Sequence, residues 1–145
     1  MQQTVNPTQA DFDRIINSIP QETPVTSLNL LRFRERAAYP TDAGFEPCTG
    51  REAYQRYLEA VKIRVANVGG QVCWVTDVLA KLTAPENEVW DAVVVVSYPS
   101  LKALLSMPRQ LSEGSNEPVH RTVALEDSRT LLIRTPILNH ETSRL

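Results

Sequence analysis

The sequence predicts an α+β domain whose four strands and intervening helices follow the order β-α-β-β-α-β. The stretch from Val89 to Ser97 is too short to cross a membrane, yet it is apolar on both strand faces. It therefore predicts a central strand that is covered on both sides. Another strand-like run, Gln71 to Leu82, precedes it, and a short helical pattern follows it. With 145 residues, 42% of them hydrophobic, the chain is long enough for one soluble domain with its own core.

The first two elements are predicted from two different periodicities. Apolar residues after Thr8 recur at helical spacing up to Ile19, and Pro20 ends this short amphipathic helix, which we assign to an N-terminal extension, residues 1–24. Residues 25–34 read V-T-S-L-N-L-L-R-F-R and predict the first strand. Its side chains alternate between two faces, one with Leu28, Leu30 and Arg32 and the other with Asn29, Leu31 and Phe33.

A long connection and the best supported helix come next. Residues 35–48 contain Pro and Gly and predict a loop, and loops of this length inside compact domains are commonly functional. Its aromatic residues Tyr39 and Phe45 favour an ordered cover over a free linker. Thr49 and Glu52 then form a capping box, so a helix begins there and ends at Gly69-Gly70.

The second half of the chain predicts a hairpin, two helical pieces and a last strand. Gln71 to Leu82 and Val89 to Tyr98 are expected to pair through a turn-rich connection. Ser100 caps a helix from Leu101 to Met107, and a second helical piece runs from Asn116 to about Leu125. Ser128 to Thr135 is the fourth strand. The domain thus spans residues 25–135, and residues 136–145 are expected to form a loose C-terminal tail.

Charge and cysteine content exclude several classes of partner. The net charge is -2 and basic residues are scattered among acidic ones, so we expect no binding to nucleic acid or to a membrane. Cys73 is expected to be a buried thiol in the second strand, and neither a disulfide framework nor a metal site is indicated. The first residues resemble neither a signal peptide nor a transmembrane span, so the expected localisation is cytoplasmic.

Several short motifs occur in a recognisable order along the chain. They are L-N-L-L-R-F (28–33), A-Y-P (38–40), G-x-x-A-Y-x-x-Y (50–57), G-G (69–70), W-D (90–91), Y-P-S (98–100) and A-L-E-D-S-R (124–129). In this order, residues 25–135 resemble the DUF1330 family of dimeric α/β-barrel proteins. The resemblance implies a ferredoxin-like fold with a four-stranded antiparallel sheet and a homodimer that packs sheet against sheet. The chain departs from the family at Ser112-Glu113-Gly114, where a P-E-Y-like motif is frequent, and in its extra N-terminal helix.

Two polar residues on the first strand are candidates for a catalytic role. The Arg32 guanidinium could hold a carboxylate or enolate, and the alternative is a structural ion pair with Asp91 on the neighbouring strand. Asn29 could donate an amide hydrogen to a developing oxyanion. Alternatively, it satisfies backbone groups beneath the long loop.

His120 is the third catalytic candidate, because it is the one histidine inside the predicted fold. Helical spacing places it near Asp127, with which it could form a proton-transfer pair, or it could be merely packed or exposed. Arg121 matches a position that is frequently Arg in the resembled family, and the resemblance implies a ligand or inter-subunit contact, although an ion pair with Glu117 or Glu126 explains it equally. The aromatic candidates for ligand binding are Tyr39, Tyr54, Tyr57 and Trp90. Core packing is the default expectation for Tyr54, Tyr57, Trp74 and Trp90.

No signature of zinc hydrolysis, serine-nucleophile chemistry or nucleotide binding occurs in the sequence. We therefore expect a protein that binds a small organic molecule in a pocket under the 35–48 loop and needs no cofactor. Its enzymatic form would act on a carbonyl or enolisable substrate, with Asn29 and Arg32 stabilising negative charge and His120 moving a proton. The alternatives are a non-catalytic ligand-binding or structural homodimer and, by analogy with other barrels of this kind, a haem-binding protein.

Overall fold

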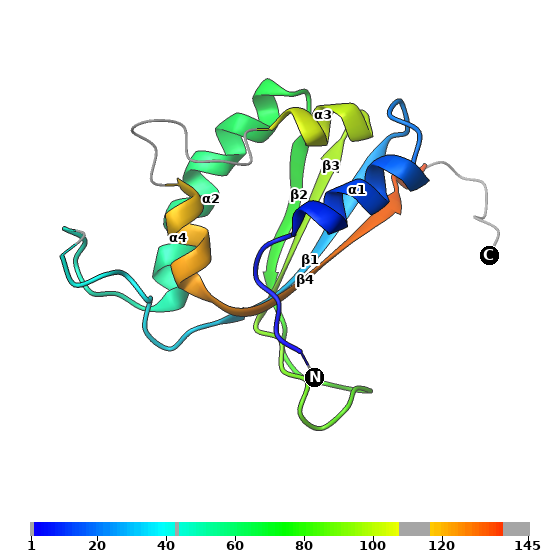
Figure 1. The fold of residues 1–145 in the computed structure, drawn as a ribbon. Coiled ribbons are helices and arrows are strands. Elements are labelled where there is room, and N and C mark those ends of the chain that lie inside the picture. Colours follow the sequence, from blue (N-terminus) through cyan, green and yellow to red (C-terminus); the bar gives the residue numbers. More distant parts are fainter. Residues whose placement is uncertain (1, 43, 108–116, 138–145) are drawn as a thin grey trace.

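The computed structural model describes residues 2–42, 44–107 and 117–137, and its centre is a four-stranded antiparallel sheet. The strands are β1 (Val25–Phe33), β2 (Gln71–Asp77), β3 (Ala92–Tyr98) and β4 (Leu125–Arg134), and they lie in the order β2-β3-β1-β4. Figure 1 shows the twisted sheet with the helices beside it. The α+β class and the central position of β3, both predicted from the sequence, are confirmed.

In the part of the chain that the structure describes, four helices accompany the sheet: α1 (Gln9–Ser18), α2 (Gly50–Asn67), α3 (Leu101–Ser106) and α4 (Glu117–Ala124). The predicted capping box of α2 is present, because the Thr49 hydroxyl accepts from the Glu52 amide and the Glu52 carboxylate accepts from the Thr49 amide. Gly69 has a φ of 82°, a left-handed conformation that terminates the helix as expected. Within the described residues, no helix has the length and apolar character needed to cross a membrane.

The hydrophobic core lies between the helices and one face of the sheet. The register pairs Leu31 with Ala92 and Val25 with Tyr98, and these four side chains are buried on the helical side. Tyr54 and Val65 of α2 are buried in this core. The half-buried Ile15 of α1 and the C-cap residue Ile19 pack against it. Figure 1 and the contacts between elements agree that α2 and α4 lie side by side.

The opposite face of the sheet is apolar and forms no part of this core. We call it the open face, and define it by six residues whose side chains alternate with those of the core: Leu28, Leu30, Trp74, Val93, Val95 and Leu131. Trp74 is 66% exposed and Leu131 is 58% exposed. The prediction that Trp74 and Cys73 are core residues is wrong. Both belong to β2, an edge strand with a bulge at Cys73, and both are exposed.

Several predicted boundaries are also wrong. β2 ends at Asp77 instead of Leu82 and β3 begins at Ala92 instead of Val89, because residues 78–91 leave the ladder as a projecting connection. α4 passes directly into β4 at Leu125, so the strand begins three residues before the predicted Ser128. The polar segment 109–115 and residues 138–145 of the tail lie outside the described residues.

Candidate functional site

Four side chains from the 35–48 loop and two helices meet in one group, which we call the loop–helix cluster: Tyr39, Phe45, Arg56 and His120. The Tyr39 hydroxyl lies 2.5 Å from Nδ1 of His120. Phe45 stacks on Tyr39 with ring centroids 4.7 Å apart, and His120 meets the edges of both rings. From α2, a guanidinium nitrogen of Arg56 donates to the Tyr39 hydroxyl at 3.4 Å.

Backbone hydrogen bonds explain why a loop without regular structure holds Tyr39 in place. The Ala37 amide donates to the Cys48 carbonyl, which closes the loop on itself. The Ala38 amide donates to the Val123 carbonyl of α4, which docks the neighbouring Tyr39 against the helix that carries His120. The prediction that the 35–48 loop is an ordered cover is consistent with this geometry.

The cluster combines a permanent positive charge with two groups that can exchange a proton. The hydrogen bond to Tyr39 raises the pKa of Arg56, so its guanidinium stays charged. Because Arg56 donates to the Tyr39 oxygen, the Tyr39 proton can be directed toward His120 Nδ1. A phenol and an imidazole in this contact can pass a proton between them beside a fixed cation.

Asn29 is engaged within the sheet. Its amide nitrogen donates to the Ser27 hydroxyl at 3.1 Å and to the Val94 carbonyl at 3.0 Å. Its amide oxygen accepts from the Thr130 hydroxyl at 2.9 Å. The amide thus satisfies one backbone carbonyl, as in the structural alternative, but its partners lie on the neighbouring strands and two of them are hydroxyl groups.

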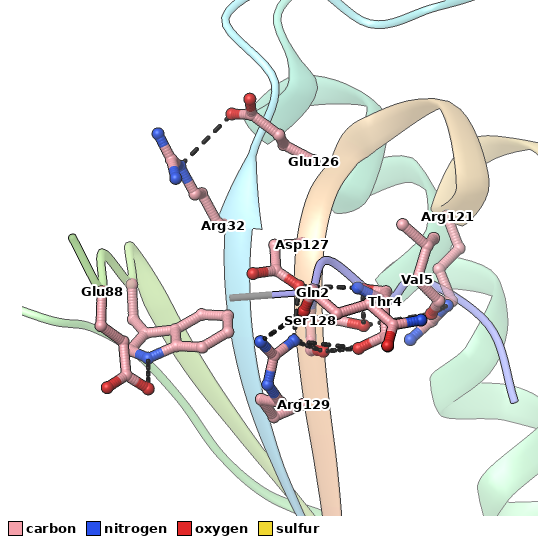
Figure 2. Close-up of polar contacts among 11 residues, drawn as sticks. Gln2, Thr4, Val5, Arg32, Glu88, Arg121, Glu126, Asp127, Ser128 and Arg129 are labelled. Atoms are coloured by element: carbon pink, nitrogen blue, oxygen red, sulfur yellow. Dashed lines mark hydrogen bonds and ion pairs between the residues drawn. The ribbon is translucent and has the colours of Figure 1, made fainter. Parts of the chain in front are cut away.

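Arg32 lies on the opposite side of the sheet from Asn29 and forms an ion pair with Glu126, with 3.3 Å between Nε and the carboxylate (Figure 2). The predicted partner, Asp91, instead accepts from the backbone amide of Phe33. Asn29, Arg32 and His120 therefore do not converge on one site. His120 contacts the Tyr39 hydroxyl, and Asp127, its expected partner, belongs to β4 and accepts from the Thr4 amide.

Arg121 and Arg129 fasten the N-terminal segment against β4 (Figure 2). Arg121 donates to the Val5 carbonyl at 2.7 Å and to the Asn6 side-chain oxygen at 2.8 Å. Arg129 donates to the Gln2 carbonyl and to Asp127. The contacts of Arg121 are therefore with its own chain.

The other aromatic candidates occupy three different environments. Tyr54 is on the buried side of α2, beside the half-buried Tyr57. Burial raises the pKa of Tyr54, so its hydroxyl remains protonated at neutral pH. Burial likewise raises the pKa of Tyr98 to about 12. The Arg129 guanidinium lies over the Trp90 ring, with its central carbon 5.1 Å from the ring centroid. The Trp90 indole nitrogen donates to the Glu88 carboxylate.

An open groove of about 570 Å³ runs along the outer side of α2. Val75 of β2 and Leu58 contribute apolar surface, and Arg56 lies in the lining together with Lys62. The groove therefore adjoins the loop–helix cluster through Arg56. In the described part of the chain, no group of three or more His, Cys, Asp or Glu side chains is placed to hold a metal ion.

The sequence indicated part of this cluster. Tyr39, Phe45 and His120 were each identifiable as an aromatic cover or a titratable group, but their contact was not. Arg56 was missed because it is one of several cations on the exposed side of α2, and no spacing distinguishes it from Arg51 or Lys62.

The fold and the cluster define an α+β protein with a loop-covered helical side and an open apolar sheet face. No family model matches the chain, and no curated protein does. The crystal structure of the RPA0582 protein, a protein of unknown function from Rhodopseudomonas palustris, is similar with a TM-score of 0.80 and 32% identity, over 94% of this chain and 99% of that one. The structure of methylated RPA0582 is also similar, with a TM-score of 0.80 and 33% sequence identity. The match covers 97% of this chain and 100% of the RPA0582 chain. The chain belongs to the same family as RPA0582.

Proposed function

We propose that this protein is a homodimer that binds a small organic acid at the loop–helix cluster and moves a proton on it without a cofactor. The observation that carries the proposal is the contact between the Tyr39 hydroxyl and His120 Nδ1 beside the charged Arg56. Arg56 supplies the charge that recognises a carboxylate. Phe45 supplies an apolar surface for the body of the ligand.

The reaction class is proton abstraction next to a carbonyl group. The Tyr39–His120 pair removes a proton from the carbon beside the carbonyl, and the electrons of the broken C–H bond form the enolate. The negative charge resides on the carbonyl oxygen, where the Arg56 guanidinium stabilises it. The same pair returns a proton to carbon, so the step needs neither oxidant nor reductant.

The open face supports the homodimer. Leu28, Val95 and Leu131 are neighbours across three strands, and contiguous apolar surface of this kind is typical of protein interfaces. Packing two open faces together would bury Trp74 and Leu131, which are more than half exposed in one chain. The resemblance to dimeric α/β-barrel proteins implies the same sheet-to-sheet packing.

The test is hydrogen exchange on candidate substrates. A panel of 2-oxo acids and their methyl esters is incubated with the protein in D₂O, and loss of the proton beside the carbonyl is followed by NMR. We expect enzyme-dependent exchange with at least one acid, much slower exchange with its ester, and about a hundredfold loss in His120→Ala. Arg56→Gln should weaken binding of the acid, whereas Lys62→Gln, on the same helix, should not.

The controls separate the site from the fold. Tyr39→Phe keeps the aromatic stack but removes the hydroxyl, and should lower exchange with little change in thermal stability. Exchange and binding that survive both His120→Ala and Arg56→Gln would overturn the proposed site. The absence of exchange and of binding across the whole panel would overturn the proposed function.

A further inference from the structure

The connection between β2 and β3, residues 78–91, is an ordered projection that exposes leucines. We call it the β2–β3 arm. Leu79 is 96% exposed and Leu82 is 99% exposed. Figure 1 shows that the arm extends beyond the end of the sheet. The exposure of the two leucines means that neither packs on the described part of its own subunit.

Hydrogen bonds hold the arm at its base and near its tip. At the base, the Val78 amide donates to the Asp91 carbonyl and the Asp91 amide donates to the Leu31 carbonyl. Near the tip, the Lys81 ammonium donates to the carbonyls of Pro85 and Glu86. These bonds hold the backbone of the arm in one conformation. The exposed leucines are therefore carried by an ordered loop.

The arm is continuous with the open face. Trp90, at the arm's base, lies under the guanidinium of Arg129. Arg129 is paired across the sheet with Leu30, which is one of the open-face residues. A partner that covers the open face therefore comes within reach of the arm.

The size of the open face indicates what the arm would add. Neighbouring strands are about 4.8 Å apart and a strand rises about 3.3 Å per residue, so four strands of 7 to 10 residues present a face on the order of 500 Å². A stable protein interface buries about 800 Å² on each partner. Because side chains make the accessible surface of a face larger than this flat area, the sheet alone is close to the area that a stable dimer needs, and an isologous dimer would gain additional contact from two arms at once.

We propose that the β2–β3 arm is a dimerisation arm, whose Leu79 and Leu82 pack on a second copy of this chain beside the open face. The proposal rests on the homodimer proposed above. It adds a second contact region, outside the sheet, that sets how tightly the two copies associate.

The test compares the dissociation of full-length variants by sedimentation equilibrium. Leu79→Ser/Leu82→Ser should raise the dimer dissociation constant about tenfold or more, because buried apolar anchors dominate interface energies. Ala80→Ser/Ala84→Ser is the matched control, since it places two serines on the same arm at exposed alanines, and should leave the constant unchanged. Circular dichroism verifies that each subunit remains folded.

Three outcomes separate this proposal from the homodimer itself. A wild-type chain that is monomeric overturns both the arm and the homodimer. A wild-type dimer whose dissociation constant is unchanged in Leu79→Ser/Leu82→Ser overturns the arm alone, whatever other molecule the leucines contact. Equal weakening in the leucine variant and in the alanine control also overturns it, because the effect would then not depend on the leucines.

Discussion

At the residue scale, Gly50 shows how closely the backbone segments around the loop approach one another. A Cβ atom at Gly50 would lie 2.3 Å from the Arg34 carbonyl oxygen and 2.6 Å from the Ala124 carbonyl oxygen. Both obstacles are backbone atoms that cannot move aside independently. Gly50 therefore permits the junction where β1 ends, α2 begins and α4 passes into β4.

We predict that Gly50→Ala lowers the free energy of unfolding by about 2–4 kcal/mol, because overpacking forces backbone shifts. Gly44→Ala is the control. Gly44, unlike Gly50, has a positive φ of 79°, but nothing lies within 4 Å of its added Cβ, so we expect a loss of only about 1 kcal/mol. Urea unfolding measures both variants, and equal losses would contradict the close-approach argument.

Asp127 is a second residue with a measurable consequence. Burial raises its pKa, but hydrogen bonds from the Thr4 amide and Arg129 outweigh burial and hold the pKa below 3.8. The unfolded chain therefore takes up this proton more readily. The stabilisation by ionised Asp127 is complete above about pH 5 and is lost as the pH falls through the folded pKa.

We predict that Asp127→Asn costs about 1–3 kcal/mol at pH 7, because the donors around the carboxylate lose a charged acceptor. The cost should shrink as the pH falls below about 4, where the wild-type carboxyl becomes protonated. Urea unfolding of both chains between pH 2 and 7 provides the measurement. A difference that stays constant over this range would show that the charge of Asp127 is not responsible.

At the element scale, the 35–48 loop brings the Tyr39 hydroxyl to His120 on α4. Its attachment depends on backbone hydrogen bonds to Cys48 and Val123 and on the stack of Tyr39 with Phe45. Regular periodicity does not govern such a loop. This explains why the sequence predicted its existence and its aromatic cover but not its docking partner.

We predict that Tyr39→Ala accelerates proteolytic cleavage within residues 35–48 by about tenfold or more, because the loop loses its main apolar anchor. Tyr39→Phe should be cleaved at nearly the wild-type rate, since the ring stack is retained. Limited proteolysis followed by mass spectrometry locates the cuts. Rapid cleavage of the wild-type loop would mean that it is an exposed linker.

The difference between local sequence signals and contacts between distant residues explains which elements the sequence predicted well. Capping boxes, the Gly69 stop and the apolar run of β3 are local signals, and each corresponds to an element of the structure. The limits of β2 and β4 depend on partners distant in the sequence. The separation of Asn29 from Arg32, by contrast, follows from local geometry: they are three residues apart on one strand, so they point to opposite faces.

At the scale of the whole molecule, the protein has one helical side and one bare apolar side. The helices bury only one face of the sheet, although the central strand β3 carries apolar residues on both. Val93 and Val95 of that strand point to the open face. This asymmetry supports the proposed packing of a second copy of the chain against the sheet.

The most direct test of this account is the mass of the protein in solution, measured by light scattering coupled to size-exclusion chromatography at micromolar concentration. We predict twice the chain mass of 16.3 kDa for the wild type. Leu131→Asp, which places a charge on the open face at the edge strand β4, should yield folded chains of single mass, whereas Ile63→Asp on the exposed side of α2 should remain dimeric. A wild-type protein that is stable and monomeric under these conditions would contradict the account.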